Sequence, residues 1–244
     1  MVVVDKQNTT KGKRSKMAKF KYSRKDDRFI KGISTGNKKL KNTKNVRFLI
    51  WNIPAKITCP YATEHCKGAC YACKAERAYP TCLPCRVRHL DESKCEDFVE
   101  RMIYTLETYG SGRAYENKQI VVRIHESGDF YNKEYANKWL EIARHFENTD
   151  SRFVFMAYTK SVRYFENEEI PTNMVVRFSV WDDTRAEELA IAEKMDLPIY
   201  TADTAEVVDR MVELGLAVKC ECADCGECGK CWNRAYSRII VVIH

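Results

Sequence analysis

The sequence predicts an α/β protein built on an incomplete barrel of about six strands, a partial (βα)6 barrel. The chain has 244 residues, of which 45% are apolar, and this is enough for one substantial hydrophobic core. Beyond residue 44, short runs of β-branched and aromatic residues alternate with longer amphipathic stretches. That alternation is typical of a βα repeat and not of a sandwich or a bundle. We therefore expect one main domain over residues 45–215.

The six predicted strands are short runs rich in Val, Ile, Phe and Tyr, residues that favour extended structure. Their expected ranges are 46–53, 119–125, 152–158, 174–180, 198–201 and 238–243.

The intervening segments carry helix signals. Ser93 and Glu96 have the spacing of a capping box, which predicts a helix that begins there and ends at Gly110. Over residues 132–147, apolar residues recur at helical spacing, so this helix should lay one face on the sheet.

The positive charge of the chain is concentrated at its N-terminus. Residues 1–44 contain fifteen Lys and Arg against three Asp, a balance of +12, whereas the whole chain has a net charge of +7. Such a basic segment with few large apolar residues is expected to be a flexible arm that contacts nucleic acid through phosphates. A solvated tail without a partner is the alternative.

Two groups of closely spaced cysteines dominate the rest of the sequence. Seven of the twelve cysteines lie between Cys59 and Cys95, and the other five lie between Cys220 and Cys231. No run of eighteen apolar residues and no leader cleavage site is present, so we expect a cytoplasmic protein without a membrane contact. Cysteines in that compartment stay reduced, which favours metal binding over disulfides.

The first cysteine group follows the first predicted strand, where βα folds place their chemistry. Cys66, Cys70 and Cys73 have the Cys-x3-Cys-x2-Cys spacing with which radical S-adenosylmethionine enzymes hold a [4Fe-4S] cluster. This resemblance implies a catalytic cluster whose open iron chelates S-adenosylmethionine, and a reductant protein as partner. The alternative is a structural zinc ion that is closed by four thiolates, with Cys59 as a further ligand.

The resemblance to radical S-adenosylmethionine enzymes extends beyond the cysteines. Ser127, Gly128 and Asp129 follow the second strand, where that superfamily carries a turn that contacts the methionine amino group. Thr159 and Ser179 lie at the ends of the third and fourth strands, similar to positions that line the cofactor. The resemblance therefore implies that these five residues bind S-adenosylmethionine.

A closer resemblance is to the phage family called gene product 88, and it covers about residues 36–244. In this family the first cysteines correspond to Cys59, Cys66 and Cys70, so this triad competes with Cys66, Cys70 and Cys73. A phage origin would place the protein in the host cytoplasm. The matching segments are Gly36-Asn37-Lys38-Lys39-Leu40, Ile53-Pro54-Ala55, Cys59-Pro60, Cys70-Tyr71-Ala72, His125-Glu126-Ser127-Gly128-Asp129, Cys225-x2-Cys228-x2-Cys231-Trp232 and the final His244.

The second cysteine group lies in a Cys-rich C-terminal segment, residues 216–244. Its spacing resembles the runs that bind auxiliary [4Fe-4S] clusters, and a zinc knuckle is the alternative. Cys220 precedes the group, and His244 could complete either site. The expected ligands are Cys222, Cys225, Cys228 and Cys231.

Three polar residues at the end of the second strand are the predicted catalytic groups: His125, Glu126 and Asp129. A polar cluster next to an expected helix start suits anionic or zwitterionic ligands. The alternative is a hydrogen-bond network that closes the rim of the barrel.

These patterns give one leading functional hypothesis and two alternatives. The leading hypothesis is a radical S-adenosylmethionine-like iron–sulfur enzyme whose substrate is unknown, with nucleic acid or a nucleotide as candidates. The first alternative is a zinc-containing βα barrel that exchanges bases as tRNA-guanine transglycosylases do. The second is a metal-stapled nucleic-acid-binding protein without enzymatic activity.

Overall fold

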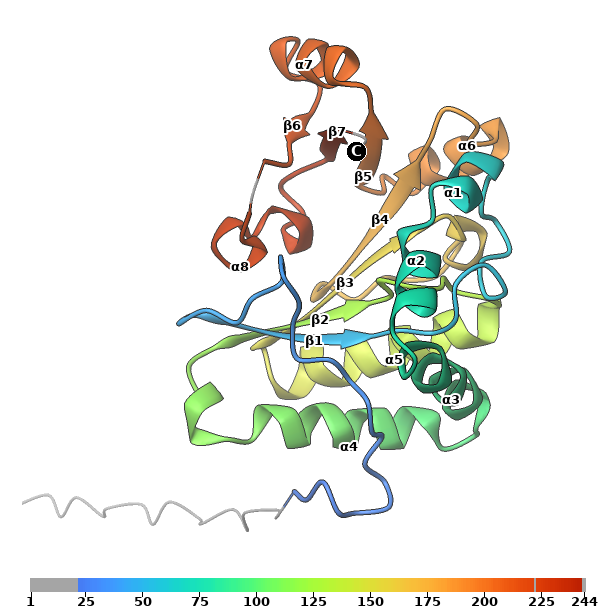
Figure 1. Ribbon diagram of the computed structural model, residues 1–244. Coiled ribbons are helices and arrows are strands. Elements are labelled where there is room, and N and C mark those ends of the chain that lie inside the picture. Colours follow the sequence, from blue (N-terminus) through green and yellow to red (C-terminus); the bar gives the residue numbers. More distant parts are fainter. Residues whose placement is uncertain (1–21, 222, 243–244) are drawn as a thin grey trace, which may run out of the picture.

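A computed structural model describes residues 22–221 and 223–242, and it shows a curled sheet of seven parallel strands (Figure 1). The strand order is β1-β2-β3-β4-β5-β7-β6, so β1 and β6 form the two edges and the sheet makes an open half-barrel. The strands are β1 Val46–Trp51, β2 Gln119–Ile124, β3 Phe153–Thr159, β4 Met174–Val180, β5 Ile199–Asp203, β6 Val218–Lys219 and β7 Arg238–Val242.

Helices cover the outer, convex face and the carboxyl edge of the sheet. In Figure 1, α4 and α5 lie beneath the sheet, while α1 and α2 lie near the carboxyl ends of the strands. Within the described part of the chain, no helix combines the length and the apolar character needed to cross a bilayer. The α-helices are α1 Glu64–Gly68, α2 Tyr71–Ala78, α3 Cys82–Lys94, α4 Phe98–Gly110, α5 Lys133–Thr149, α6 Ala186–Lys194, α7 Ala205–Glu213 and α8 Cys225–Cys228; the 3-10 helices are η1 Arg113–Tyr115, η2 Val162–Tyr164 and η3 Lys230–Trp232.

All six predicted strands are present, which confirms a parallel α/β half-barrel, and a seventh strand was missed. The missed strand, β6, has only two residues, too few to show a periodic pattern. The predicted capping box was wrong. The Ser93 hydroxyl donates to the Leu90 carbonyl inside α3, and α4 begins only at Phe98, although it ends at Gly110 as predicted.

The convex face carries the main aromatic core. The N-cap of α5 is Asn132, whose side chain accepts a hydrogen bond from the Tyr135 amide. Tyr135, Trp139 and Phe146 then lie at helical spacing and are almost fully buried against the sheet. Burial of each such side chain stabilises the fold by about 1.5–3 kcal/mol, so this face fixes α5 on the sheet.

The concave face changes from apolar to polar along the strands. Near the amino ends, Phe48 and Val121 form a small core together with Trp232, which arrives from the C-terminal segment. One or two rows further on, the inward-facing positions are Arg123 and Tyr158. The C-terminal segment therefore covers the apolar half of this face and reaches Tyr158 at the start of the polar half.

The N-terminal segment packs on the barrel from residue 22 onwards, which differs from the flexible arm expected over residues 1–44. Phe29, Ile30 and Ile33 are buried in the main core, and Ser34 pairs with Ile50 in a β-bridge. Isolated apolar residues in a basic stretch gave no periodic signal, so the expected boundary at residue 44 is too late. Residues 1–21 lie outside the described part.

Candidate functional site

The first cysteine group lies in the segment between β1 and α2, at the carboxyl edge of the sheet (Figure 1). Cys66 lies in the short helix α1, where its amide donates to the hydroxyl of the N-cap residue Thr63. Cys70 is the N-cap residue of α2, and Cys73 follows in the first turn of that helix. Two short helix starts thus hold the cysteines over the ends of the strands.

Interactions between the thiols connect the four cysteines of this group, and two of them also interact with the polar turn. Burial raises the pKa of the Cys59 thiol to about 12, and Asp129, Cys66 and Cys70 add to this effect. Burial also raises the pKa of Cys66. The charge of Lys160 opposes this rise, and Cys70 adds to it. The pKa of Cys73 is raised by burial and by Cys70, but by neither of the other two cysteines. Cys66 and Cys70 thus lie near Cys59, while Cys73 interacts directly with Cys70.

Asp129 is the centre of the polar turn at the end of β2. Its buried carboxylate accepts hydrogen bonds from the Phe130 amide (2.7 Å), the Thr159 hydroxyl (2.6 Å) and the Lys160 amide (2.9 Å). Burial raises the pKa of Asp129, while these hydrogen bonds oppose the shift. The carboxylate therefore fixes the end of β2 to the end of β3, directly beside Cys59 and Cys66.

Gly128 has no room for a side chain. It has a φ of +83°, and a Cβ atom there would lie 2.4 Å from Cγ1 of Ile53. The neighbouring Ser127 hydroxyl donates to the Ile53 carbonyl over 2.9 Å. The turn is thus held tightly against the segment that follows β1.

His125 and Glu126, both predicted to be catalytic, lie on opposite faces of the sheet. The His125 ring packs in the convex core, where its Nε2 lies 2.9 Å from the Tyr135 hydroxyl, and burial lowers its pKa to about 3. The ring thus lies among aromatic side chains on the convex side, away from the cysteines, and a catalytic role for His125 stays a prediction. Glu126 instead faces Asn37 and lies 3.6 Å from Nη1 of Arg123 on the concave side.

The two remaining predicted cofactor-binding residues lie at the ends of neighbouring strands. Thr159 is the last residue of β3, and its hydroxyl donates a hydrogen bond to Asp129. Ser179 lies near the end of β4, and its carbonyl accepts a hydrogen bond of 2.6 Å from Nζ of Lys160. Burial lowers the pKa of Lys160, whereas Cys66 and Asp129 oppose this shift. Sequence reasoning missed Lys160, although a lysine directly after a strand at this edge was a usable signal.

A cavity of about 300 Å³ lies next to Lys160, between the first cysteine segment and the start of α6. Tyr61 and Thr63 line one side of it, and Asp183 lines the other. Its position at the carboxyl edge of a parallel sheet is the usual place for a ligand in α/β folds.

The second cysteine group lies over the concave face. Cys220 follows β6, Cys225 and Cys228 lie in α8, and Cys231 lies in η3. Burial raises the pKa of Cys225 to about 11, with contributions from Cys231, Cys220 and Cys228, so the four thiols lie close together. Cys222 and His244, by contrast, lie outside the described residues.

A single buried arginine anchors this C-terminal segment. Arg177 of β4 donates four hydrogen bonds of 2.7–3.0 Å to backbone carbonyls, which belong to Lys230, Cys231, Asn233 and Tyr236. The amide of Cys225 also donates to the Lys39 carbonyl over 2.9 Å. The fold itself thus presents the second group to the concave face.

The spacing of the thiols bears on the kind of metal that they suit. Among the described residues, the one set of three or more potential ligand atoms that all lie within 4.8 Å of one another is the exposed set His65, Asp182 and Asp183. A tetrahedral zinc ion needs thiolates about 3.8 Å apart, given Zn–S bonds of about 2.3 Å. Each thiolate of a [4Fe-4S] cluster binds a different iron and so stands further from the others. Among the described cysteines, neither group brings three thiols within 4.8 Å of one another.

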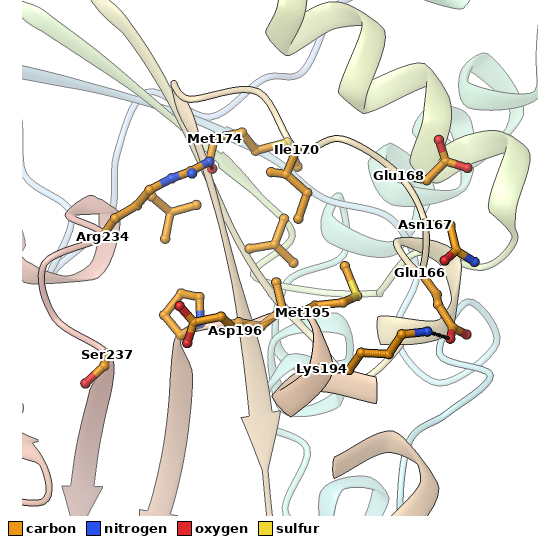
Figure 2. A pocket seen from close by; sticks show the side chains of 14 residues that line it. Glu166, Asn167, Glu168, Ile170, Met174, Lys194, Met195, Asp196, Arg234 and Ser237 are labelled. Carbon is orange, nitrogen blue, oxygen red and sulfur yellow. Dashed lines mark hydrogen bonds and ion pairs between the residues drawn. The ribbon is translucent and has the colours of Figure 1, made fainter. Parts of the chain in front are cut away.

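The other cysteines and a second cavity lie apart from both groups. Cys85 of α3 lies 3.8 Å from Nε2 of His89, and Cys95 is exposed after that helix. A cavity of about 510 Å³ opens between β4 and the start of β5, and Figure 2 shows Met174 and Arg234 on one side of it and Lys194 on the other. No cysteine lines this cavity.

Comparison with known proteins gives one match. The gene product 88 family matches residues 28–234, whereas the curated proteins and the solved structures give no match. The matched range contains both cysteine groups, the polar turn and the N-terminal segment from Arg28 onwards. The chain belongs to the gene product 88 family.

Proposed function

We propose that this protein is an iron–sulfur enzyme of the radical S-adenosylmethionine type. The observation that carries the proposal is that Cys59 and Cys66 interact with Asp129, and both interact with Cys70, at the carboxyl edge of a parallel half-barrel. Three thiols, and not four, suit a cluster with one open iron. When bound, such a cluster supplies the electron that splits the sulfonium of S-adenosylmethionine reductively.

The residues around the first group would hold the cofactor by its charged ends. Lys160 places an ammonium group beside Cys66 and the 300 Å³ cavity, where it would pair with a carboxylate. Asp129 retains acceptor capacity beyond its three hydrogen bonds, and it would receive the amino group. Ser127, Gly128, Thr159 and Ser179 hold the strand ends that frame this contact.

The second group would hold an auxiliary cluster with Cys225, Cys228 and Cys231 as ligands. Its position on the concave face, opposite the first group, suits electron delivery or contact with a substrate. Cys222 stays a predicted ligand of this group, and Cys220 is a further candidate, because its thiol interacts with those of Cys225 and Cys231. A reductant protein would supply the electrons.

The decisive experiment is anaerobic purification of the full chain, followed by iron, sulfide and zinc analysis and a cleavage assay. Brown protein with about eight irons and matching sulfide would agree with two clusters. The reduced protein should then convert S-adenosylmethionine to methionine and 5′-deoxyadenosine. Stoichiometric zinc without sulfide would refute the proposal and favour the zinc-containing barrel that acts on nucleic acid.

A further inference from the structure

Arg123 is a charged residue whose hydrogen-bonding capacity is left largely unused on the concave face. It lies in the otherwise apolar strand β2, and only 18% of its side chain is exposed. Its Nε is buried without an acceptor, and its Nη1 lies 3.6 Å from Oε1 of Glu126, too far for a hydrogen bond. Among the described residues, its guanidinium donates no hydrogen bond, although it carries five N–H donors.

Arg177 provides the contrast within the same face of the sheet. It lies in β4, and its guanidinium donates four hydrogen bonds to backbone carbonyls of the C-terminal segment. Burial of a guanidinium is costly unless its donors are satisfied. Arg177 meets that condition within the chain, whereas the Nε of Arg123 is buried without an acceptor among the described residues.

The surroundings of Arg123 indicate the chemistry of that partner. The guanidinium lies 5.2 Å from the centre of the Tyr158 ring, and the rings of Tyr158 and Tyr200 are 4.6 Å apart. Both tyrosines are half-buried, and aromatic side chains are the groups on which planar bases stack. A guanidinium beside them matches a phosphate or a carboxylate.

The same place lies between the two cysteine groups. Tyr71, next to Cys70, donates a hydrogen bond of 2.6 Å to the Glu126 carbonyl, and Tyr158 interacts with the thiol of Cys231. Burial raises the pKa of Cys225 and of Cys231, and the positive charge of Arg123 opposes this rise in both. A molecule that contacts Arg123 and Tyr158 would therefore be within reach of both groups.

We propose that Arg123, Tyr158 and Tyr200 bind a nucleotide-like substrate, with its phosphate on Arg123 and its planar base against the tyrosines. The proposal rests on the proposed function for the reaction, but the binding itself does not require the cofactor.

The test is isothermal titration of the full-length, iron-loaded protein with adenosine 5′-monophosphate, adenosine, inorganic phosphate, benzoate and, separately, S-adenosylmethionine. The monophosphate should bind more tightly than adenosine or phosphate alone. Arg123→Gln should weaken its binding at least about tenfold and leave S-adenosylmethionine binding unchanged. Arg163→Gln, a change at a half-buried arginine that pairs with Glu188 outside this face, is the control.

Three outcomes would overturn the proposal: unchanged monophosphate binding in Arg123→Gln, weakened binding of S-adenosylmethionine alone, or a preference for benzoate over the monophosphate. The last would assign the site to a carboxylate. Iron content and Tm establish that the variant is folded. Loss of S-adenosylmethionine cleavage with intact monophosphate binding would refute the proposed function alone.

A measurement on the wild-type chain keeps the proposal testable if Arg123→Gln does not fold. Phenylglyoxal modifies accessible arginines, and mass spectrometry identifies the modified peptides. The monophosphate should protect Arg123 and leave Arg163 unprotected. Equal modification of Arg123 with and without the monophosphate would contradict the proposal.

Discussion

The hydroxyl of Thr159 donates a 2.6 Å hydrogen bond to the carboxylate of Asp129, and this contact joins the ends of β3 and β2 inside the protein. Both groups are almost fully buried, so neither can exchange this bond for one to water. The same carboxylate also receives the amides of Phe130 and Lys160. The rim of the half-barrel is therefore set by one acidic side chain next to the first cysteine group.

Thr159→Val should measure the strength of this connection. The substitution keeps the shape of the side chain but removes the donor to a buried carboxylate, and we expect the free energy of unfolding to fall by about 1–3 kcal/mol. Urea unfolding gives the value. Thr149→Val, at the exposed end of α5, should change stability by less than about 0.5 kcal/mol. Equal effects of the two substitutions would show that the hydrogen bond to Asp129 contributes no more to the free energy of unfolding than the exposed one of Thr149.

The turn itself should depend on the absence of a side chain at residue 128. Gly128→Ala combines a positive φ with a Cβ only 2.4 Å from Ile53, so we expect it to destabilise the protein by more than about 2 kcal/mol. Gly215→Ala is the matched control, because Gly215 also has a positive φ but has open space around it. Its cost should be about 1 kcal/mol, that of the backbone conformation alone. Both values follow from denaturant titrations, and similar losses would exclude the clash with Ile53.

The strand predictions were confirmed where a run of apolar residues corresponds to a strand that is buried in the sheet. β4, Met174–Val180, was predicted with its observed bounds, because an apolar run bounded by turn residues has one simple interpretation. The roles of Arg123 and Arg177 were not predictable. Each is a single arginine in a mainly apolar strand. The C-terminal segment, which returns over the concave face, supplies hydrogen-bond acceptors to Arg177 but not to Arg123. The sequence motifs thus indicated where the candidate site lies. The roles of the buried arginines depend on contacts with residues far away in the sequence, which no local pattern shows.

His125 should give the protein a specific dependence on pH. Burial lowers its pKa to about 3, so the folded state keeps the ring neutral while the unfolded chain binds a proton below a pKa of about 6.5. The stabilisation is therefore complete above pH 6.5 and is lost as the pH falls towards 3, by up to about 1.4 kcal/mol per pH unit.

The comparison that isolates this effect is His125→Asn, since asparagine tolerates the positive φ of 68° at this position. The variant should be less stable at pH 7, and its stability should decline less steeply between pH 6.5 and 4. His89, whose pKa burial also lowers, remains in both proteins and cancels from the difference. Parallel stability curves would refute a neutral, buried His125.

The first cysteine group should lose its metal when Cys59, Cys66 or Cys70 is replaced by alanine, because Cys66 and Cys70 lie near enough to Cys59 to affect its pKa. The second group should stay occupied, since each group takes its ligands locally, and the iron content should fall from about eight to about four. Cys73→Ala, one helical turn beyond Cys70, should keep the full iron content. Iron analysis of the four variants decides between the two triads, and loss of iron in Cys73→Ala with retention in Cys59→Ala would reverse the assignment.

Two truncations should separate the basic charge of the N-terminus from its packing. Seven of the fifteen Lys and Arg of residues 1–44 precede residue 22, whereas Phe29, Ile30 and Ile33 are buried in the main core. Deletion of residues 1–21 should leave Tm unchanged and should weaken the retention of nucleic acid at low salt, because fewer phosphate contacts remain. Deletion of residues 1–35 should also lower the free energy of unfolding by several kcal/mol, roughly 1.5–3 for each buried apolar side chain. Thermal melting and a salt series on immobilised nucleic acid test both effects. An unchanged Tm after the longer deletion would contradict the packing of this segment, and equal retention by all three proteins would assign any nucleic-acid binding to the barrel.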